Sequence, residues 1–209
     1  MLTMHKLDAI LQNECPIVMV PLYGDLEPLA MNGHRFLAAK NGLFVDVRRP
    51  WLTLRMKFAD SEGFHFPYGK VKPFMRFNFA GKGLTRMLHQ FIAQAKETGG
   101  VETAAWLTYA PQAKTLLLSK LEYLEQGPGR VQYLRPTSSP DALPVVDCHS
   151  HASFPAFFSE TDDQDDKDDD LKIAFVVGSL NEEKPTIAMR LVGLGGVSID
   201  LTEWITELL

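Results

Sequence analysis

The chain has 209 residues, of which 45% are hydrophobic and 22% are charged, with 15 glycines and 13 prolines. These values are typical of globular proteins and exclude collagen-like, fully disordered and disulfide-scaffold classes. Two cysteines and an N-terminal apolar stretch broken by Asp8 and Glu14 predict a cytoplasmic chain without a signal peptide, and no apolar run reaches the roughly 18 residues of a membrane span.

The net charge of −5 is unevenly distributed. Residues 160–170 hold eight acidic residues and one lysine, so this run contributes −7 and leaves the rest of the chain at +2. Residues 33–86 hold eleven Lys and Arg against three acidic residues. We expect the acidic run to be solvated and disordered, because blocks of like charge repel one another. The alternatives are that it folds over the basic segment or binds divalent ions loosely.

Residues 1–80 predict a small β-rich module. Asn41-Gly42 lies between two apolar segments, and this dipeptide is the strongest short signal for a β-hairpin, here over residues 34–47. Residues 51–58 alternate apolar and polar side chains and predict a third strand. Residues 64–79 are aromatic and interrupted by prolines, which predicts irregular structure with one strand near 74–79. Aromatic and basic residues also suit the stacking of single-stranded nucleic acid, but more often they form the core of a small β module.

Residues 82–209 predict an α/β domain. Apolar residues recur at helical spacing over 84–98, and Gly99-Gly100 ends that helix. Strands are expected at residues 104–109, 115–121, 131–134, 145–148 and 173–177, followed by a hairpin of 186–194 with 197–201 and a helical turn at 204–209.

The residues that indicate chemistry follow the strand at 145–148. His149 and His151 are two apart, so on a strand their imidazoles project from one face and can meet one zinc ion. If Ser159 begins a helix, Asp162 returns as a third ligand and leaves an open fourth position, as in catalytic zinc sites. Asp163 is the alternative third ligand. The competing interpretations are a surface histidine pair and a simple helix cap at Ser159, which is compatible with a metal site.

Two enzyme classes use a His-x-His pair in this way. Asp147 with the two histidines resembles the first metal strand of amidohydrolases, but only 58 residues follow His151, too few to complete a barrel of about 250 residues. The spacing His149-x-His151, seven residues, Ser159, two residues, Asp162 instead resembles the JAMM metal motif of JAB/MPN metallopeptidases.

This resemblance implies an α/β (α+β) fold of the JAB/MPN type, a cytidine-deaminase-like mixed sheet with flanking helices over residues 82–209. It implies Zn²⁺ held by His149, His151 and Asp162. Glu102 stands where the family has its general base, with Glu97 as the rival, and Ser159 stands where the family has its oxyanion donor. Ala152 stands where many members have proline.

The implied activity is hydrolysis of a peptide or isopeptide bond, often at the C-terminal tail of a ubiquitin-like protein. The segment RFLAAKNGLFVDVRRPWL, together with the JAMM-like half, is also similar to a component of the bacterial PRTRC gene cassette, which implies ThiF-related and ParB-related partners. The alternatives are a catalytically inactive JAB/MPN-like scaffold and a nucleic-acid-binding protein with an incidental histidine pair.

Overall fold

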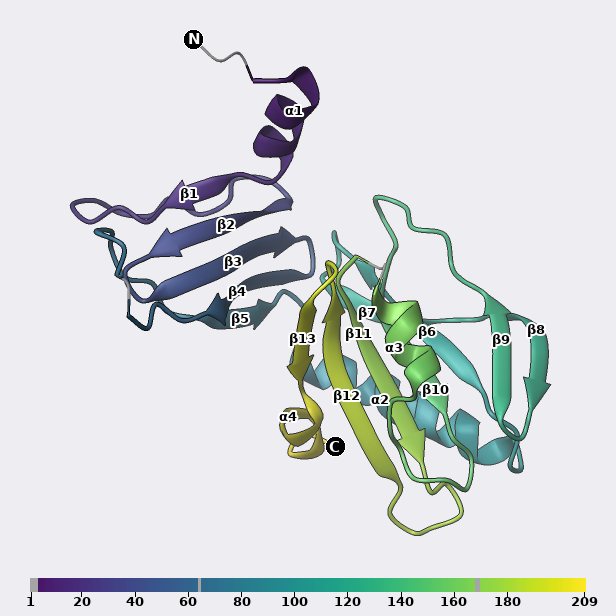
Figure 1. The fold of residues 1–209 in the computed structure, drawn as a ribbon. Helices are drawn as coiled ribbons and strands as arrows, with labels where there is room; N and C mark the ends of the chain where they lie inside the picture. Colours follow the sequence, from purple (N-terminus) through teal and green to yellow (C-terminus); the bar gives the residue numbers. More distant parts are fainter. Residues whose placement is uncertain (1–3, 64, 168–169) are drawn as a thin grey trace. The chain divides into compact units, whose positions relative to one another are not determined.

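The computed structural model describes residues 4–63, 65–167 and 170–209, and the chain divides into two compact units, Met1–Asn78 and Phe79–Leu209 (Figure 1). Each unit has a large sheet of its own. Among the described residues, no helix is both long and apolar enough to cross a membrane.

A five-stranded sheet in the order β1-β2-β3-β4-β5 forms the N-terminal unit. The predicted hairpin is confirmed, since β2 and β3 pair antiparallel with Ala39 opposite Gly42, whose φ of 128° suits glycine. The Asn41 side chain bonds both backbone polar groups of Val71 and so attaches the predicted irregular segment to the sheet. The strands are β1 (Ile17–Met19), β2 (Gly33–Ala39), β3 (Gly42–Arg49), β4 (Leu52–Ala59) and β5 (Phe74–Phe77).

The helix α1 (Lys6–Glu14) is absent from the sequence prediction. The spacing of Leu7, Ile10 and Leu11 is the helical signal that could have found it. None of its residues is buried, so the apolar side of α1 is exposed in this structure. The short strand β1, which pairs parallel with β2, is likewise absent from the prediction.

A six-stranded mixed sheet in the order β13-β12-β11-β10-β6-β7 forms the centre of the C-terminal unit. Of the described strand pairs of this sheet, only β10 with β11 is parallel, and α3 lies in the connection between them. The mixed sheet with few flanking helices confirms the predicted fold class. The elements are α2 (Gly81–Glu97), β6 (Ala104–Ala110), β7 (Thr115–Ser119), β8 (Glu122–Gly127), β9 (Arg130–Leu134), β10 (Leu143–Ser150), α3 (Glu160–Lys167), β11 (Lys172–Gly178), β12 (Thr186–Gly193), β13 (Val197–Asp200) and α4 (Thr202–Thr206).

The two faces of this sheet have different roles. The apolar side of α2 covers one face, where Phe91 meets Phe175 edge to face at 6.4 Å. Cys148 is the register partner of Phe175, so it belongs to that buried face. Side chains alternate along a strand, so Asp147 and His149 project from the opposite face, on the side of α3 (Figure 1).

The expectation of a disordered acidic run is wrong for residues 160–167, which form α3. Residues 168–169 of the run lie outside the described residues. The helix is ordered because its acidic side chains find cations on neighbouring strands: Asp166 pairs with Lys172 of β11 and Arg190 of β12, at 2.8 and 2.5 Å. The ion pairs of Asp166 thus hold this part of the acidic run against the sheet.

The segment after β6 also differs from the prediction. β7 ends at Ser119, and β8 pairs with β9 in a separate two-stranded sheet (Figure 1). β8 is exposed along almost its whole length, so its sequence lacks the apolar alternation that marks a half-buried strand. The final helical turn lies at Thr202–Thr206, slightly earlier than expected.

Candidate metal centre

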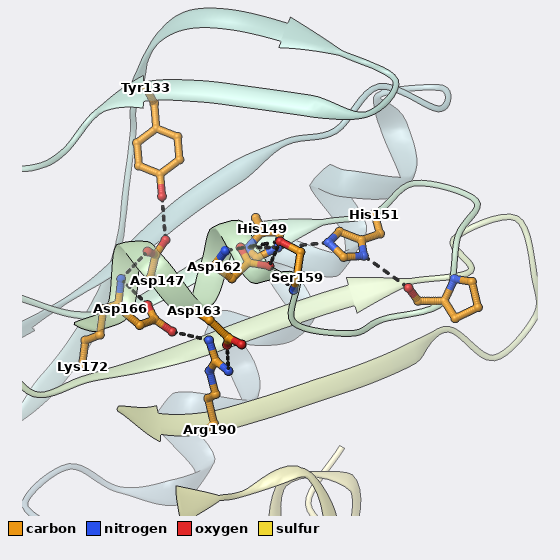
Figure 2. Close-up of polar contacts among 11 residues, drawn as sticks. Tyr133, Asp147, His149, His151, Ser159, Asp162, Asp163, Asp166, Lys172 and Arg190 are labelled. Carbon is orange, nitrogen blue, oxygen red and sulfur yellow. Dashed lines mark hydrogen bonds and ion pairs between the residues drawn. The ribbon is translucent and has the colours of Figure 1, made fainter. Parts of the chain in front are cut away.

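One histidine of β10, the histidine just after that strand and one aspartate from the first turn of α3 meet on one face of the sheet (Figure 2). The Nε2 atoms of His149 and His151 are 3.2 Å apart, and His149 Nε2 lies 3.6 Å from Asp162 Oδ1. One ligand atom from each residue lies within 4.8 Å of the others. The structure thus brings together the three side chains predicted as ligands. Asp163, the alternative ligand, pairs with Arg190 instead.

The surroundings of His151 fix which of its nitrogens faces the site. Its Nδ1 lies 3.3 Å from the carbonyl oxygen of Pro155, and a carbonyl oxygen can only accept a hydrogen bond. In the neutral ring Nδ1 therefore carries the proton, and the lone pair of Nε2 faces His149. Burial lowers the pKa of His151, and the neighbouring His149 lowers it further, which favours this neutral form. The ring of Phe157 packs edge-on at 4.5 Å.

The residue after His151 has a local reason to depart from the proline of the resembled motif. Ala152 is buried and has a φ of 46°. Proline is restricted to a φ near −65° and cannot adopt that conformation. The backbone carbonyl of Ala152 accepts a hydrogen bond from the backbone N–H of Leu180, which fixes the turn that follows β10.

Asp162 is oriented by a reciprocal cap at the start of α3. The backbone N–H of Ser159 donates to Asp162 Oδ2 at 2.6 Å, and the backbone N–H of Asp162 donates to Ser159 Oγ at 3.2 Å. The Ser159 hydroxyl also donates to Oδ2 at 2.7 Å. This is a capping box in which the acidic residue is aspartate. It occupies Oδ2 and directs Oδ1 toward His149, so the cap and the metal interpretations describe one arrangement.

The separations of His149 from each of the other two candidate ligands fit a zinc ion. Zinc binds imidazole nitrogen at about 2.0–2.1 Å in tetrahedral geometry, so two of its ligand atoms lie about 3.3–3.4 Å apart. The observed separations of 3.2 Å between the two nitrogens and 3.6 Å between nitrogen and oxygen lie on either side of that value. Two imidazole nitrogens and one carboxylate oxygen are a donor set of catalytic zinc sites, which keep a fourth position open.

Glu102, in the segment between α2 and β6, lines the same cavity as the three candidate ligands. Burial raises its pKa to about 7, and the negative charge of Asp162 contributes to the rise. A carboxyl group with this pKa exchanges protons at neutral pH. Glu97, the rival for this role, is an exposed residue of α2 and does not line the cavity.

Ser150, between the two histidines, attaches the Glu102 segment to the metal site. Its Oγ accepts a hydrogen bond from the backbone N–H of Thr103 at 3.0 Å, and its own backbone N–H donates to the Thr103 carbonyl at 2.9 Å. The backbone N–H of Glu102 donates to the carbonyl of Gly127 in β8. Sequence reasoning missed these contacts, because a buried serine inside a His-x-His pair gives no signal for its distant partner.

The cavity has a volume of about 1110 Å³ and opens between the sheet, α3 and the β8–β9 hairpin. Its lining includes exposed apolar side chains: Phe154 and Phe157 from the loop after His151, and Leu124 from β8, all more than half exposed. The rest of the lining mixes charged and polar side chains with apolar ones such as Trp106, Val131 and Phe158. The cavity is large enough for several residues of an extended peptide.

Two family models match the chain. A model described as prokaryotic homologs of the JAB domain matches residues 84–192, just over half of the chain, and a domain of unknown function (DUF2016) matches residues 5–78. A search of the curated proteins finds no match.

Proposed function

The chain belongs to the family of prokaryotic JAB-domain homologues, and from this premise we propose that its C-terminal unit is a zinc-dependent metallopeptidase that cleaves a peptide or isopeptide bond. One observation carries the proposal. His149, His151 and Asp162 converge with ligand atoms within 4.8 Å of one another, and Glu102, with its pKa raised to about 7, lines the same cavity.

The chemistry divides between the metal and the side chains. A zinc ion held by His149, His151 and Asp162 supplies Lewis-acid activation of water and of the scissile carbonyl. Glu102 takes a proton as general base and returns it to the leaving amine as general acid, which its pKa near neutrality allows. The Pro155 carbonyl holds His151 in the tautomer that ligation requires.

Ser159 is proposed as the hydrogen-bond donor to the developing oxyanion. In this structure its hydroxyl donates to Asp162 Oδ2. Substrate binding then requires the hydroxyl to rotate, while the backbone N–H of Ser159 keeps Asp162 oriented. A donor of this kind contributes roughly 3 kcal/mol to transition-state stabilisation.

The proposed substrate is an extended polypeptide tail, such as that of a ubiquitin-like protein, and the proposed cellular partners are ThiF-related and ParB-related proteins. The open cavity suits a chain rather than a small molecule. The proposed location is the cytoplasm, where an unpaired Cys148 stays reduced.

Elemental analysis of bound metal tests the proposal most directly. We expect about one zinc per wild-type chain and none in the variant His149→Ala/His151→Ala. Glu102→Gln is the matched control, because it keeps all three ligands and is expected to retain zinc while losing hydrolysis of an internally quenched peptide library. A wild-type protein that takes up no zinc when zinc is supplied would contradict the peptidase and favour a scaffold that only binds partners.

A further inference from the structure

A buried lysine near the candidate metal site connects β10 and α3, the two elements that also carry His149 and Asp162. The ammonium of Lys172, the first residue of β11, lies 3.2 Å from Asp147 Oδ2 and 2.8 Å from Asp166 Oδ1. Lys172 is only 4% exposed, and so its charge is almost removed from water. Such an arrangement holds two carboxylates at a fixed separation.

Asp147 and Asp166 lie on the same two elements as the candidate ligands, on the same side of each element. Asp147 precedes His149 by two residues and therefore lies on the same face of β10. Asp166 follows Asp162 by four residues and lies about one turn further along the same side of α3. Lys172 thus bridges β10 and α3 as a zinc ion would bridge His149 and Asp162 (Figure 2).

The bridge formed by Asp147, Lys172 and Asp166 has a further hydrogen-bond or ion-pair partner at each of its two carboxylates. Tyr133 of β9 donates its hydroxyl to Asp147 Oδ1 at 2.7 Å. Arg190 of β12 pairs with Asp166 at 2.5 Å and with Asp163 at 2.6 Å, and its guanidinium lies 3.9 Å from the centre of the Phe158 ring. Both carboxyl oxygens of Asp147 and of Asp166 are therefore used, and neither side chain is free to rotate.

We propose that Lys172 is a positioning residue for the metal centre, which keeps α3 and β10 at the separation that ligation by His149 and Asp162 requires, before any metal binds. The inference rests on the proposed function, because it assumes that these residues bind zinc. A purely structural role would stabilise the unit without affecting zinc affinity. Positioning predicts an effect on affinity at unchanged stability.

The test uses the full chain and a variant that removes the bridge, while Arg190 keeps Asp163 as its carboxylate partner. Lys172→Met/Asp147→Asn/Asp166→Asn replaces the charged groups by neutral ones of similar size, which buried ion-pair replacements tolerate. Arg35→Met is the control, because it removes a buried cation from the N-terminal unit, where Asp46 keeps its second partner Arg55. Zinc affinity is measured by competition with a chromophoric chelator, and amide hydrogen exchange is measured on the metal-free proteins.

We expect the triple variant to keep its melting temperature and to bind zinc about 10- to 100-fold more weakly, the range found for residues that support metal ligands. We also expect faster exchange of the amides of α3, with β10 and β11 unchanged. The control should bind zinc as the wild type does. Zinc affinity within twofold of the wild type in a folded triple variant would overturn the inference alone. A wild type without zinc would overturn the proposed function, and with it this inference.

Discussion

The two units each contain a group of buried charges, and the groups differ in what they connect. In the N-terminal unit, Arg35, Asp46 and Arg55 are register partners on β2, β3 and β4, and Asp46 accepts from both guanidiniums at 2.8–3.1 Å. In the C-terminal unit, Lys172 and its partner Asp166 join strands to a helix that carries a candidate ligand. Paired charges on neighbouring strands of one sheet fix the register of those strands. Paired charges between a sheet and the helix that covers it fix the position of the helix, and with it the geometry of a site that both elements form.

Glu102 sharpens this contrast, because it is a half-buried carboxyl whose pKa is raised by burial and by Asp162 rather than held down by a cation. The largest effect we expect is from Glu102→Gln. Removing a general base typically costs about 10²- to 10⁴-fold in rate. The rate of peptide hydrolysis, measured with zinc content as control, checks it. Full activity in the Gln variant would assign the base elsewhere.

Glu102→Gln is expected to lower activity but to raise the stability of the metal-free protein above neutral pH. Without metal, the folded-state pKa of Glu102 is about 7 against an ordinary 4.5, so the folded protein holds a proton that the unfolded chain releases between these values. The favourable contribution is therefore present below about pH 4.5 and is lost as the pH rises through about 7. Melting temperatures of the metal-free proteins should show Glu102→Gln more stable than the wild type at about pH 8, and no such gain at about pH 4. A gain that does not vary with pH would contradict the assignment.

Asp46→Asn gives the second largest effect and acts on the N-terminal unit. It leaves the buried guanidinium of Arg35 and the partly buried one of Arg55 without their carboxylate, and breaking a buried pair in this way costs about 3–5 kcal/mol. Denaturant unfolding measures the loss. The number of zinc ions per chain is expected not to change, because the charges involved fix only the register of β2, β3 and β4. A loss of zinc in this variant would show that the contrast between the two charge groups is false.

Local signals account for what the sequence predicted. The hairpin at Asn41-Gly42 and the helix α2 follow from turn chemistry and periodicity, and the ligand spacing from His149 to Asp162 needs only a strand, a loop and a helix start. The order of α3 could not be predicted, because it depends on Lys172 and Arg190, which come from later strands. A charge run has the same sequence whether water or a buried cation surrounds it.

Ser159→Ala tests how the ligand is oriented within α3. The variant loses the hydroxyl that accepts from the Asp162 N–H and donates to Oδ2, and the loss of a helix cap costs about 1 kcal/mol. We expect a small fall in melting temperature and weaker zinc binding, with Ser159→Thr close to the wild type. The backbone N–H of residue 159 remains, so the effect should be smaller than that of removing the Lys172 bridge. Calorimetric titration with zinc measures it.

Leu11→Ser gives the smallest expected effect. The side chain of Leu11 in α1 is 66% exposed, and no residue of that helix is buried. Surface substitutions of this kind change stability by less than about 0.5 kcal/mol, and the site lies in the other unit, so melting temperature and zinc affinity should both match the wild type. Leu37→Ser is the paired variant, because Leu37 is fully buried in the core of the N-terminal unit and its replacement should cost several times more. A large loss of stability from Leu11→Ser would mean that the apolar side of α1 is covered in solution, since only a buried leucine contributes so much.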